Sequence, residues 1–355
     1  MADGGMDTRA GERDVLRVCT FKGLQNLPLY VASRQGYFAS RDLDVQVSYT
    51  TGSAAQLEGL GRGAYELIQT APDNVVNADA NPAAFNLDPA TALAERPPDP
   101  GGSGRPPDAP TFALLLGGSV GPLSLMAHQS VASVAALRGM VLGVDNPGSG
   151  FALVLRDMLA RHGLALDRDY TFTISGGTSA RLDALRSGTV AATLLYPPFD
   201  ALAEAAGFRR LVTSTQLYPA YASLATAATQ PWIEAHGEIG TRYIGAILQA
   251  LRWLYDPANA TDAQALIRDE PALGGLDAGT AARAYADFVA PATGFGQDAA
   301  LDMAGLRQVI ALRAAYANPA GVHRTPLRSV DDHPAPLRAP EAYCDLRWYE
   351  RARRL

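Results

Sequence analysis

The stretch 141–155, VLGVDNPGSGFALVL, changes its pattern in the middle, and this change constrains the fold more than any other feature. Its first residues are apolar, as in a buried strand, and the turn-forming residues 146–150 follow. An apolar stripe that begins at Phe151 then predicts a helix, with Ser149 as its N-cap. The free N–H groups at such a helix start can bind an anion, although turns of this composition also form for backbone reasons alone.

Junctions of this kind recur in two series along the chain. We expect strands at 15–21, 43–49 and 67–70 in the first series and at 141–144, 170–174 and 191–196 in the second. Strands that are joined through helices pair in parallel, because a parallel crossover needs a connection of helix length. Such sheets bind ligands at the carboxyl edge of their strands. The sequence therefore predicts an α/β protein of two lobes, each a mainly parallel sheet flanked by helices, with a cleft between them.

The order of the segments predicts how the lobes are divided. We expect the first lobe to be discontinuous, at 15–122 and 222–355, and the second to be formed by 123–221. Residues 1–14 are small, polar and charged, which predicts a disordered N-terminus, and the Pro- and Gly-rich stretch 86–110 predicts a flexible surface insertion.

The C-terminal part of the chain is expected to be helical. Apolar stripes predict helices at 232–255, 278–288 and 303–316. The tail from 318 on is rich in proline and predicted to be irregular, with Tyr343, Trp348 and Tyr349 as anchors.

Composition excludes several classes of partner. The net charge of −6 and the dispersed arginines argue against a nucleic-acid partner. No segment reaches the roughly eighteen apolar residues that a membrane span requires, so we expect a chain that does not cross a membrane. His128 and His162 are isolated, and Cys19 and Cys344 match no metal-ligand spacing, so no metal site is predicted.

Two features leave alternatives open. Cys19 is most simply a core residue, and it could pair with Cys344 only if the tail folds back beside the first strand. Lys22 is the only lysine in an arginine-rich chain and follows the first strand, so it is either a retained functional ammonium or a chance survivor.

Short sequence motifs in both halves of the chain resemble those of a known protein family. They lie at 36–38 before 43–45, at 52–53, 137–139 and 143–145, at 176–178 with Arg181, and at 194–199 and 253–259. With these motifs the chain, from Val15 on, resembles the NMT1-like substrate-binding proteins of ABC importers. That class includes sulfonate, nitrate and taurine binders together with relatives that make the thiamine pyrimidine. The resemblance implies the type 2 periplasmic-binding-protein fold.

The resemblance also implies a set of ligand-binding residues. They are Lys22, Gln25, Asn26, Ser53, Asp73 and Asn74 in the first lobe, and Ser149, Phe151, Gly177, Thr178 and Tyr196 in the second. Their amides, hydroxyls, cation and aromatic rings suit a small polar or anionic organic molecule with a planar part. Each residue also has a structural alternative: Asn26 and Asn74 as turn caps, Asp73 as a helix cap, and Phe151 and Tyr196 as core residues.

The function that the resemblance implies is solute binding for an ABC permease, without a catalytic residue or cofactor. The resemblance places such a protein in the periplasm, whereas the N-terminal residues lack the apolar region of a secretory signal, which leaves the cytoplasm open. The alternative is a cytoplasmic enzyme on the same fold. Thiamine-pyrimidine synthesis is disfavoured, because the expected helix 72–80 has neither lysine nor histidine and no cysteine cluster is present. A decarboxylase or dehydratase that pairs Asp73 with Lys22 stays open.

Overall fold

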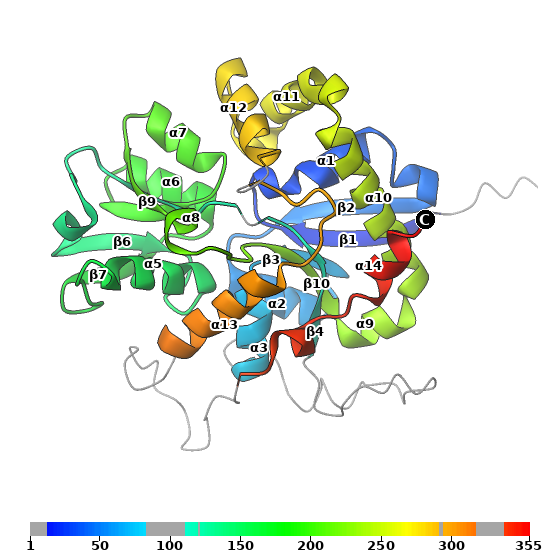
Figure 1. Ribbon diagram of the computed structural model, residues 1–355, viewed down its shortest axis with the longest axis horizontal. Helices are drawn as coiled ribbons and strands as arrows, with labels where there is room; N and C mark the ends of the chain where they lie inside the picture. The colour runs from blue at the N-terminus through cyan, green and yellow to red at the C-terminus, as the bar shows by residue number, and fades with distance from the viewer. Residues whose placement is uncertain (1–12, 83–110, 120, 291–293, 317–336) are drawn as a thin grey trace, which may run out of the picture.

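The computed structural model in Figure 1 describes residues 13–82, 111–119, 121–290, 294–316 and 337–355. The expected surface insertion lies outside these residues, and so does the expected disordered N-terminus up to residue 12. Asp14 is already ordered as the first residue of β1, so the first strand starts one residue earlier than predicted.

Two five-stranded sheets form the framework. The first has the order β2-β1-β3-β10-β4 and the second the order β7-β6-β8-β5-β9. Their strands are β1 (Asp14–Thr20), β2 (Leu43–Tyr49), β3 (Leu67–Thr70), β4 (Phe112–Gly117) and β10 (Ala225–Thr229), and β5 (Ser124–Ala127), β6 (Met140–Val144), β7 (Tyr170–Ile174), β8 (Ala192–Leu195) and β9 (Arg209–Thr213). We call the two sheets with their covering helices the first and second lobes; Figure 1 shows them side by side.

One strand in each sheet is antiparallel to the other four. In the first sheet β1 pairs in parallel with β2 and β3, while β10 pairs antiparallel with β3 and β4. The second sheet repeats this arrangement, with β5 as its antiparallel strand. Both β10 and β5 are the first strands after the chain passes from one lobe to the other. The predicted two-lobed α/β fold with mainly parallel sheets is confirmed, and the reversed strands make both sheets mixed.

Short helices cover the sheets and begin at the turn residues. In the first lobe they are α1 (Leu27–Arg34), α2 (Ser53–Gly61) and α3 (Pro72–Ala80), and in the second α5 (Gly150–Ala160), α6 (Thr178–Arg186), α7 (Phe199–Ala205) and α8 (Ser214–Leu217). Ser149 caps α5 as predicted: its Oγ accepts a hydrogen bond from the N–H of Ala152 at 3.3 Å.

The C-terminal helices are α9 (Gln230–Ala235), α10 (Gly237–Tyr255), α11 (Ala260–Asp269), α12 (Ala278–Phe288), α13 (Met303–Tyr316) and α14 (Arg347–Ala352). The single helix predicted at 232–255 is wrong, because the backbone leaves the helical region at His236 (φ −127°, ψ 36°). Just after this break, Gly240 lies against Trp348, and an added Cβ would lie 1.9 Å from the indole ring. The missing side chain at Gly240 therefore lets the tail pack closely on α10.

The tail is held by its aromatic residues. Tyr343, Trp348 and Tyr349 are buried, as predicted for anchors, and the last two lie on α14, where an irregular chain was expected. Cys344 forms an isolated bridge with Leu114 of β4, so the tail folds back beside β4 and not beside β1. Both cysteines are free thiols, and Cys19 is a buried core residue.

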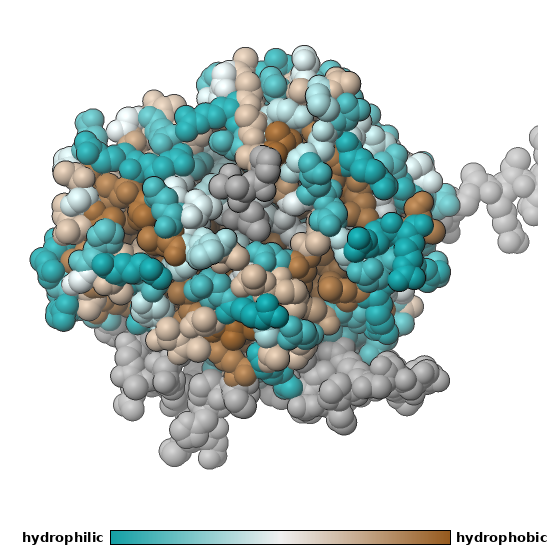
Figure 2. Space-filling model, in the orientation of Figure 1, coloured by the Kyte–Doolittle hydropathy of each residue, from teal (hydrophilic) through white to brown (hydrophobic). Residues whose placement is uncertain are grey.

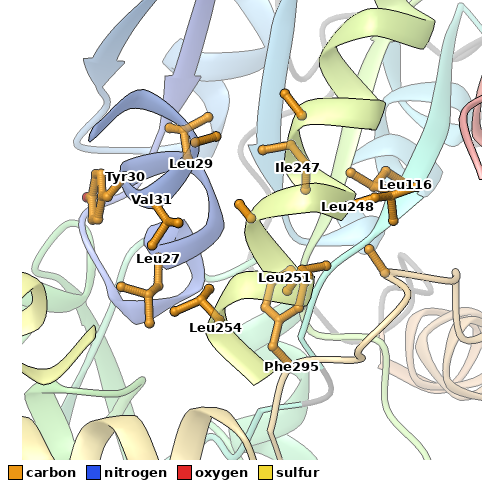
Figure 3. Packing of buried hydrophobic residues seen from close by; sticks show 14 of the residues in the cluster. Leu27, Leu29, Tyr30, Val31, Leu116, Ile247, Leu248, Leu251, Leu254 and Phe295 are labelled. Carbon is orange, nitrogen blue, oxygen red and sulfur yellow. The ribbon is translucent and has the colours of Figure 1, made fainter. Parts of the chain in front are cut away.

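The apolar core has two main parts. In the first, α1 packs against α10, where Leu27, Leu251 and Leu254 lie close together (Figure 3). The second runs without interruption from the first lobe into the second, and Leu306, Val309 and Leu312 of α13 belong to it. On the face in Figure 2, hydrophilic and hydrophobic side chains are interspersed. None of the helices in the described ranges combines the length and the apolar content that a bilayer crossing requires.

Candidate ligand-binding pocket

A pocket lies between the two lobes and is lined from both. The space between its lining atoms is about 500 Å³, including space open to solvent, and about 40 Å³ of it is open to the centre of a water molecule. One water needs about 10–15 Å³ by this measure, so the pocket has room for about three waters or a molecule of similar size. It is lined by Phe21, Lys22, Gln25, Ala71, Asn74, Asp145, Ser149, Gly150, Phe151, Gly177, Thr178, Arg181, Tyr196 and Leu224.

Eight of the eleven predicted site residues are brought together here. From the first lobe they are Lys22, Gln25 and Asn74, and from the second Ser149, Phe151, Gly177, Thr178 and Tyr196. They come from five junctions at the carboxyl ends of β1, β3, β6, β7 and β8, as parallel sheets with facing carboxyl edges require. That they contact a ligand stays a prediction.

The first-lobe half of the pocket carries a loosely held cation. The ammonium of Lys22 lies 5.8 Å from the ring centroid of Tyr49, and Lys22 is exposed. Beside it, Gln25 donates from Nε2 to the carbonyl of Phe21 at 2.9 Å, while its buried Oε1 has no hydrogen-bond partner. Because a buried carbonyl oxygen without a partner is costly, Gln25 is a candidate acceptor for a ligand N–H or O–H group.

The second-lobe half is a fixed polar network around Asp145 and Arg181. Asp145 accepts from the Oγ of Ser149 at 2.6 Å, and the Nη1 of Arg181 lies 3.8 Å from the Asp145 carboxylate. Arg181 is buried and donates to the carbonyls of Leu194 (3.1 Å) and Gly176 (3.0 Å). Burial lowers the pKa of the Arg181 guanidinium and the nearby Asp145 carboxylate opposes this effect. The two opposite charges therefore offset one another, which leaves Lys22 as the cation without a carboxylate partner among the lining residues.

Sequence reasoning missed Asp145 and Arg181 as pocket residues. Both lie in motifs that carried the family resemblance, 143–145 and 176–178 with Arg181, so the signal was present. The other lining residues that were missed are Phe21, Ala71, Gly150 and Leu224, which complete the apolar part of the lining. Burial raises the pKa of the Tyr196 phenol, so this side chain is neutral.

Three predicted residues, Asn26, Ser53 and Asp73, are absent from the pocket lining. Asn26 is fully buried and holds the β1–α1 turn: its Nδ2 donates to the carbonyl of Phe21 and its Oδ1 accepts from Thr20 Oγ1, each at 2.7 Å. Ser53 lies across the interlobe interface from Asp145, with 3.4 Å between its Oγ and the carboxylate. Both therefore lie beside the pocket, and Asn26 holds the turn that carries Lys22 and Gln25.

Asp73 is held by a partner that was not predicted from the sequence. Its carboxylate is 1% exposed and accepts two hydrogen bonds from Arg313 of α13, at 2.6 and 2.5 Å. A helix-start carboxylate that is neutralised in this way is unavailable to a ligand or to Lys22 as an acid–base partner. The described residues also contain no group of three or more His, Cys, Asp or Glu side chains that could hold a metal ion.

The two lobes are in contact around the pocket. The N–H of Leu24 in the first lobe donates to the carbonyl of Pro197 in the second at 3.0 Å. Gly177 packs so closely on Phe21 that an added Cβ would lie 3.3 Å from the ring, and a Cβ on Gly176 would lie 3.6 Å from the carbonyl of Thr51. The structure is therefore a closed form of the cleft.

Comparison with known proteins supports the fold. Residues 121–268 match the NMT1-like family. The alkanesulfonate-binding protein SsuA from Xanthomonas axonopodis pv. citri, bound to MOPS, aligns with a TM-score of 0.64 at 17% identity, over 87% of this chain and 94% of that one. The periplasmic nitrate-binding protein NrtA from Synechocystis PCC 6803 aligns with a TM-score of 0.70 at 11% identity, over 97% and 89%.

An enzyme has a similar structure as well. The desulfurization enzyme DSZB aligns with a TM-score of 0.56 at 14% identity, over 96% of this chain and 99% of that one. No curated protein matches the sequence significantly. The chain thus has the fold of the periplasmic binding proteins of ABC importers, and its segment 121–268 matches the NMT1-like family.

Proposed function

We propose that this chain is a solute-binding protein that closes on one small organic anion with a planar or apolar part. The observation that carries this proposal is the composition of the pocket. Lys22 has no carboxylate partner among the lining residues, and the opposite lobe contributes a fixed polar network and aromatic side chains. An anionic head can contact Lys22, while Phe21 and Phe151 offer flat surfaces to the rest of the molecule. The sulfonate and nitrate named for the similar structures are anions too.

The partner and the compartment follow from the same proposal. A binding protein of this fold would deliver its ligand to an ABC permease, and it would do so in the periplasm. The lobes would move about the two chain passages, between β4 and β5 and between β9 and β10, where we place the lobe boundaries at 122/123 and 221/222.

An enzyme on this fold is the competing proposal, and DSZB gives it a precedent. Among the described residues, the pocket lining includes no cysteine or histidine, and its one carboxylate, Asp145, is held by Ser149 and lies beside Arg181. Asp73, the predicted acid–base group, is bound by Arg313. Binding without turnover therefore has more support than catalysis.

A thermal-shift screen tests the proposal. The probes are MOPS and other sulfonates, nitrate, aromatic carboxylates and neutral pyrimidines, and we expect an organic anion to raise the melting temperature. Lys22→Ala should weaken binding of that probe about tenfold or more, because a charge-assisted hydrogen bond contributes about 1.5–3 kcal/mol. Arg354→Ala, which removes an exposed cation from the tail, is the control.

The outcomes separate the two proposals. No stabilising probe, or an anionic probe that binds Lys22→Ala as tightly as the unsubstituted chain, would contradict the proposed ligand class. Appearance of a new product by mass spectrometry after incubation with the stabilising probe would favour the enzyme.

A further inference from the structure

The helix α13 lies where the two lobes meet and contacts both of them (Figure 1). At its start, Gly305 packs against the chain passage that returns to the first lobe: an added Cβ would lie 2.4 Å from the backbone N of Ala222. At its end, Tyr316 donates from its hydroxyl to Asp157 of α5 at 2.8 Å and accepts at its carbonyl from Arg156 at 2.7 Å. The helix is therefore fixed at one end beside the passage and at the other end to the second lobe.

Between these ends, Arg313 joins the lobes directly. Its guanidinium donates to both carboxylate oxygens of Asp73 and, at 2.8 Å, to Oδ1 of Asn77, both on α3 of the first lobe. The same Nη2 that contacts Asp73 also donates, at 2.8 Å, to the carbonyl of Gly148 in the second lobe. The planar guanidinium of Arg313 thus makes four hydrogen bonds, three to the first lobe and one to the second. The residue is only 3% exposed.

The carbonyl that Arg313 contacts belongs to the loop that forms the second-lobe half of the pocket. Ser149 and Gly150, the next two residues, line the pocket, whereas Arg313 does not. The loop also lies directly against Asp73, since an added Cβ on Gly150 would be 2.5 Å from the Asp73 Cβ. Opening the lobes must therefore separate this loop from Asp73, and Arg313 must lose its contacts with one lobe, either those with Asp73 and Asn77 or the one with Gly148.

We propose that Arg313 is a latch that holds the cleft closed through Asp73 and Gly148, without touching the ligand. The latch lowers the free energy of the closed form whether or not the pocket is filled. It acts as a positioning residue, because the loop that it holds presents Ser149 and Gly150 to the pocket. The proposal rests on the opening and closing that the proposed function requires, but its test uses no ligand, so a failed ligand screen would leave it intact.

The test measures the width of the cleft mouth by electron paramagnetic resonance. Spin labels are attached at Thr51→Cys and Ile174→Cys, two exposed positions near the contact between Gly176 and Thr51, in a background with Cys19→Ala and Cys344→Ser. The latch variant is Asp73→Asn with Arg313→Met, which removes the latch without leaving an unpaired charge buried. Arg307→Met is the matched control, since Arg307 lies on the same helix but forms an exposed ion pair with Glu341.

We expect a short label distance in the ligand-free chain and in Arg307→Met, and an added population at longer distance in the latch variant. Arg313→Lys keeps the charge but not the fork, so it should give an intermediate population, and it is the variant to read if the double substitution does not fold. The proposal is overturned if the folded latch variant keeps the short distance, if the ligand-free chain already shows the long one, or if Arg307→Met opens the cleft equally.

Discussion

The interlobe interface has two sides that are built differently. On the mouth side, which we define by Leu24, Thr51, Ser53, α12 and their second-lobe neighbours, the lobes meet through one backbone hydrogen bond, a long hydroxyl contact, glycine packing and a half-exposed ion pair between Arg283 and Glu204. On the α13 side Arg313 bridges them, with a buried ion pair to Asp73 and a hydrogen bond to the carbonyl of Gly148, and the apolar core is continuous. Contacts that are few and half-exposed open at low cost, whereas buried charges and apolar area do not. The difference indicates that the α13 side sets how readily the cleft opens.

The largest effect should come from breaking the ion pair on the α13 side. Asp73→Ala leaves the buried Arg313 without its carboxylate, and removal of one partner of a buried pair costs about 3–5 kcal/mol. We expect the free energy of unfolding in urea to fall by this amount. Glu341→Ala is the control, because it removes the carboxylate partner of another α13 arginine at an exposed site, where a pair contributes about 0–1 kcal/mol. Equal losses in the two variants would show that the α13 side is not special.

A smaller, pH-dependent effect should come from Asp157, which binds the end of α13. Burial raises the pKa of its carboxyl, but hydrogen bonds from Tyr218, Arg161 and Tyr316 outweigh this and hold the pKa below the usual 3.8. A carboxyl whose pKa is lowered on folding adds stability above its unfolded pKa and loses it as the pH falls through the folded pKa.

Asp157→Asn should therefore be less stable than the unsubstituted chain at about pH 6, and the difference should shrink toward about pH 3. Urea unfolding of both chains across this range measures it. A difference that stays constant with pH would mean that the network does not favour the charged form of Asp157.

The contrast also explains what could be predicted from the sequence. The strand–turn–helix junctions are local, so the positions of β2, β3 and β7 and the cap at Ser149 followed from short-range patterns, while the eight predicted residues of the pocket lining came from the family resemblance. Asp73 was not predicted to form an ion pair, for the same reason. Its position at a helix start is a local signal, while its partner Arg313 lies 240 residues away and is set by tertiary packing.

Other features were missed because their patterns are weak. The strand β10 reads ATAAT, with small residues that carry little strand signal, and its place between β3 and β4 is determined by the return from the second lobe. The break at His236 lies inside a stretch with a helical apolar stripe, so the pattern carries no signal for it. The pocket residues Asp145 and Arg181 were visible as motifs, but pairing them needs the two loops brought together in space.

The smallest effect should come from the mouth side. Ser53 Oγ lies 3.4 Å from the Asp145 carboxylate, which is long for a hydrogen bond, and Asp145 keeps its shorter bond of 2.6 Å from Ser149 when Ser53 is replaced. Ser53→Ala should therefore change the free energy of unfolding by less than about 1 kcal/mol. Ser149→Ala is the comparison within the same network, because it removes both the shorter bond and the α5 cap, and a lost cap alone costs about 1 kcal/mol. If Ser53→Ala were the more damaging of the two in urea unfolding, the mouth side would hold the lobes more firmly than its contacts indicate, and the contrast between the two sides would not stand.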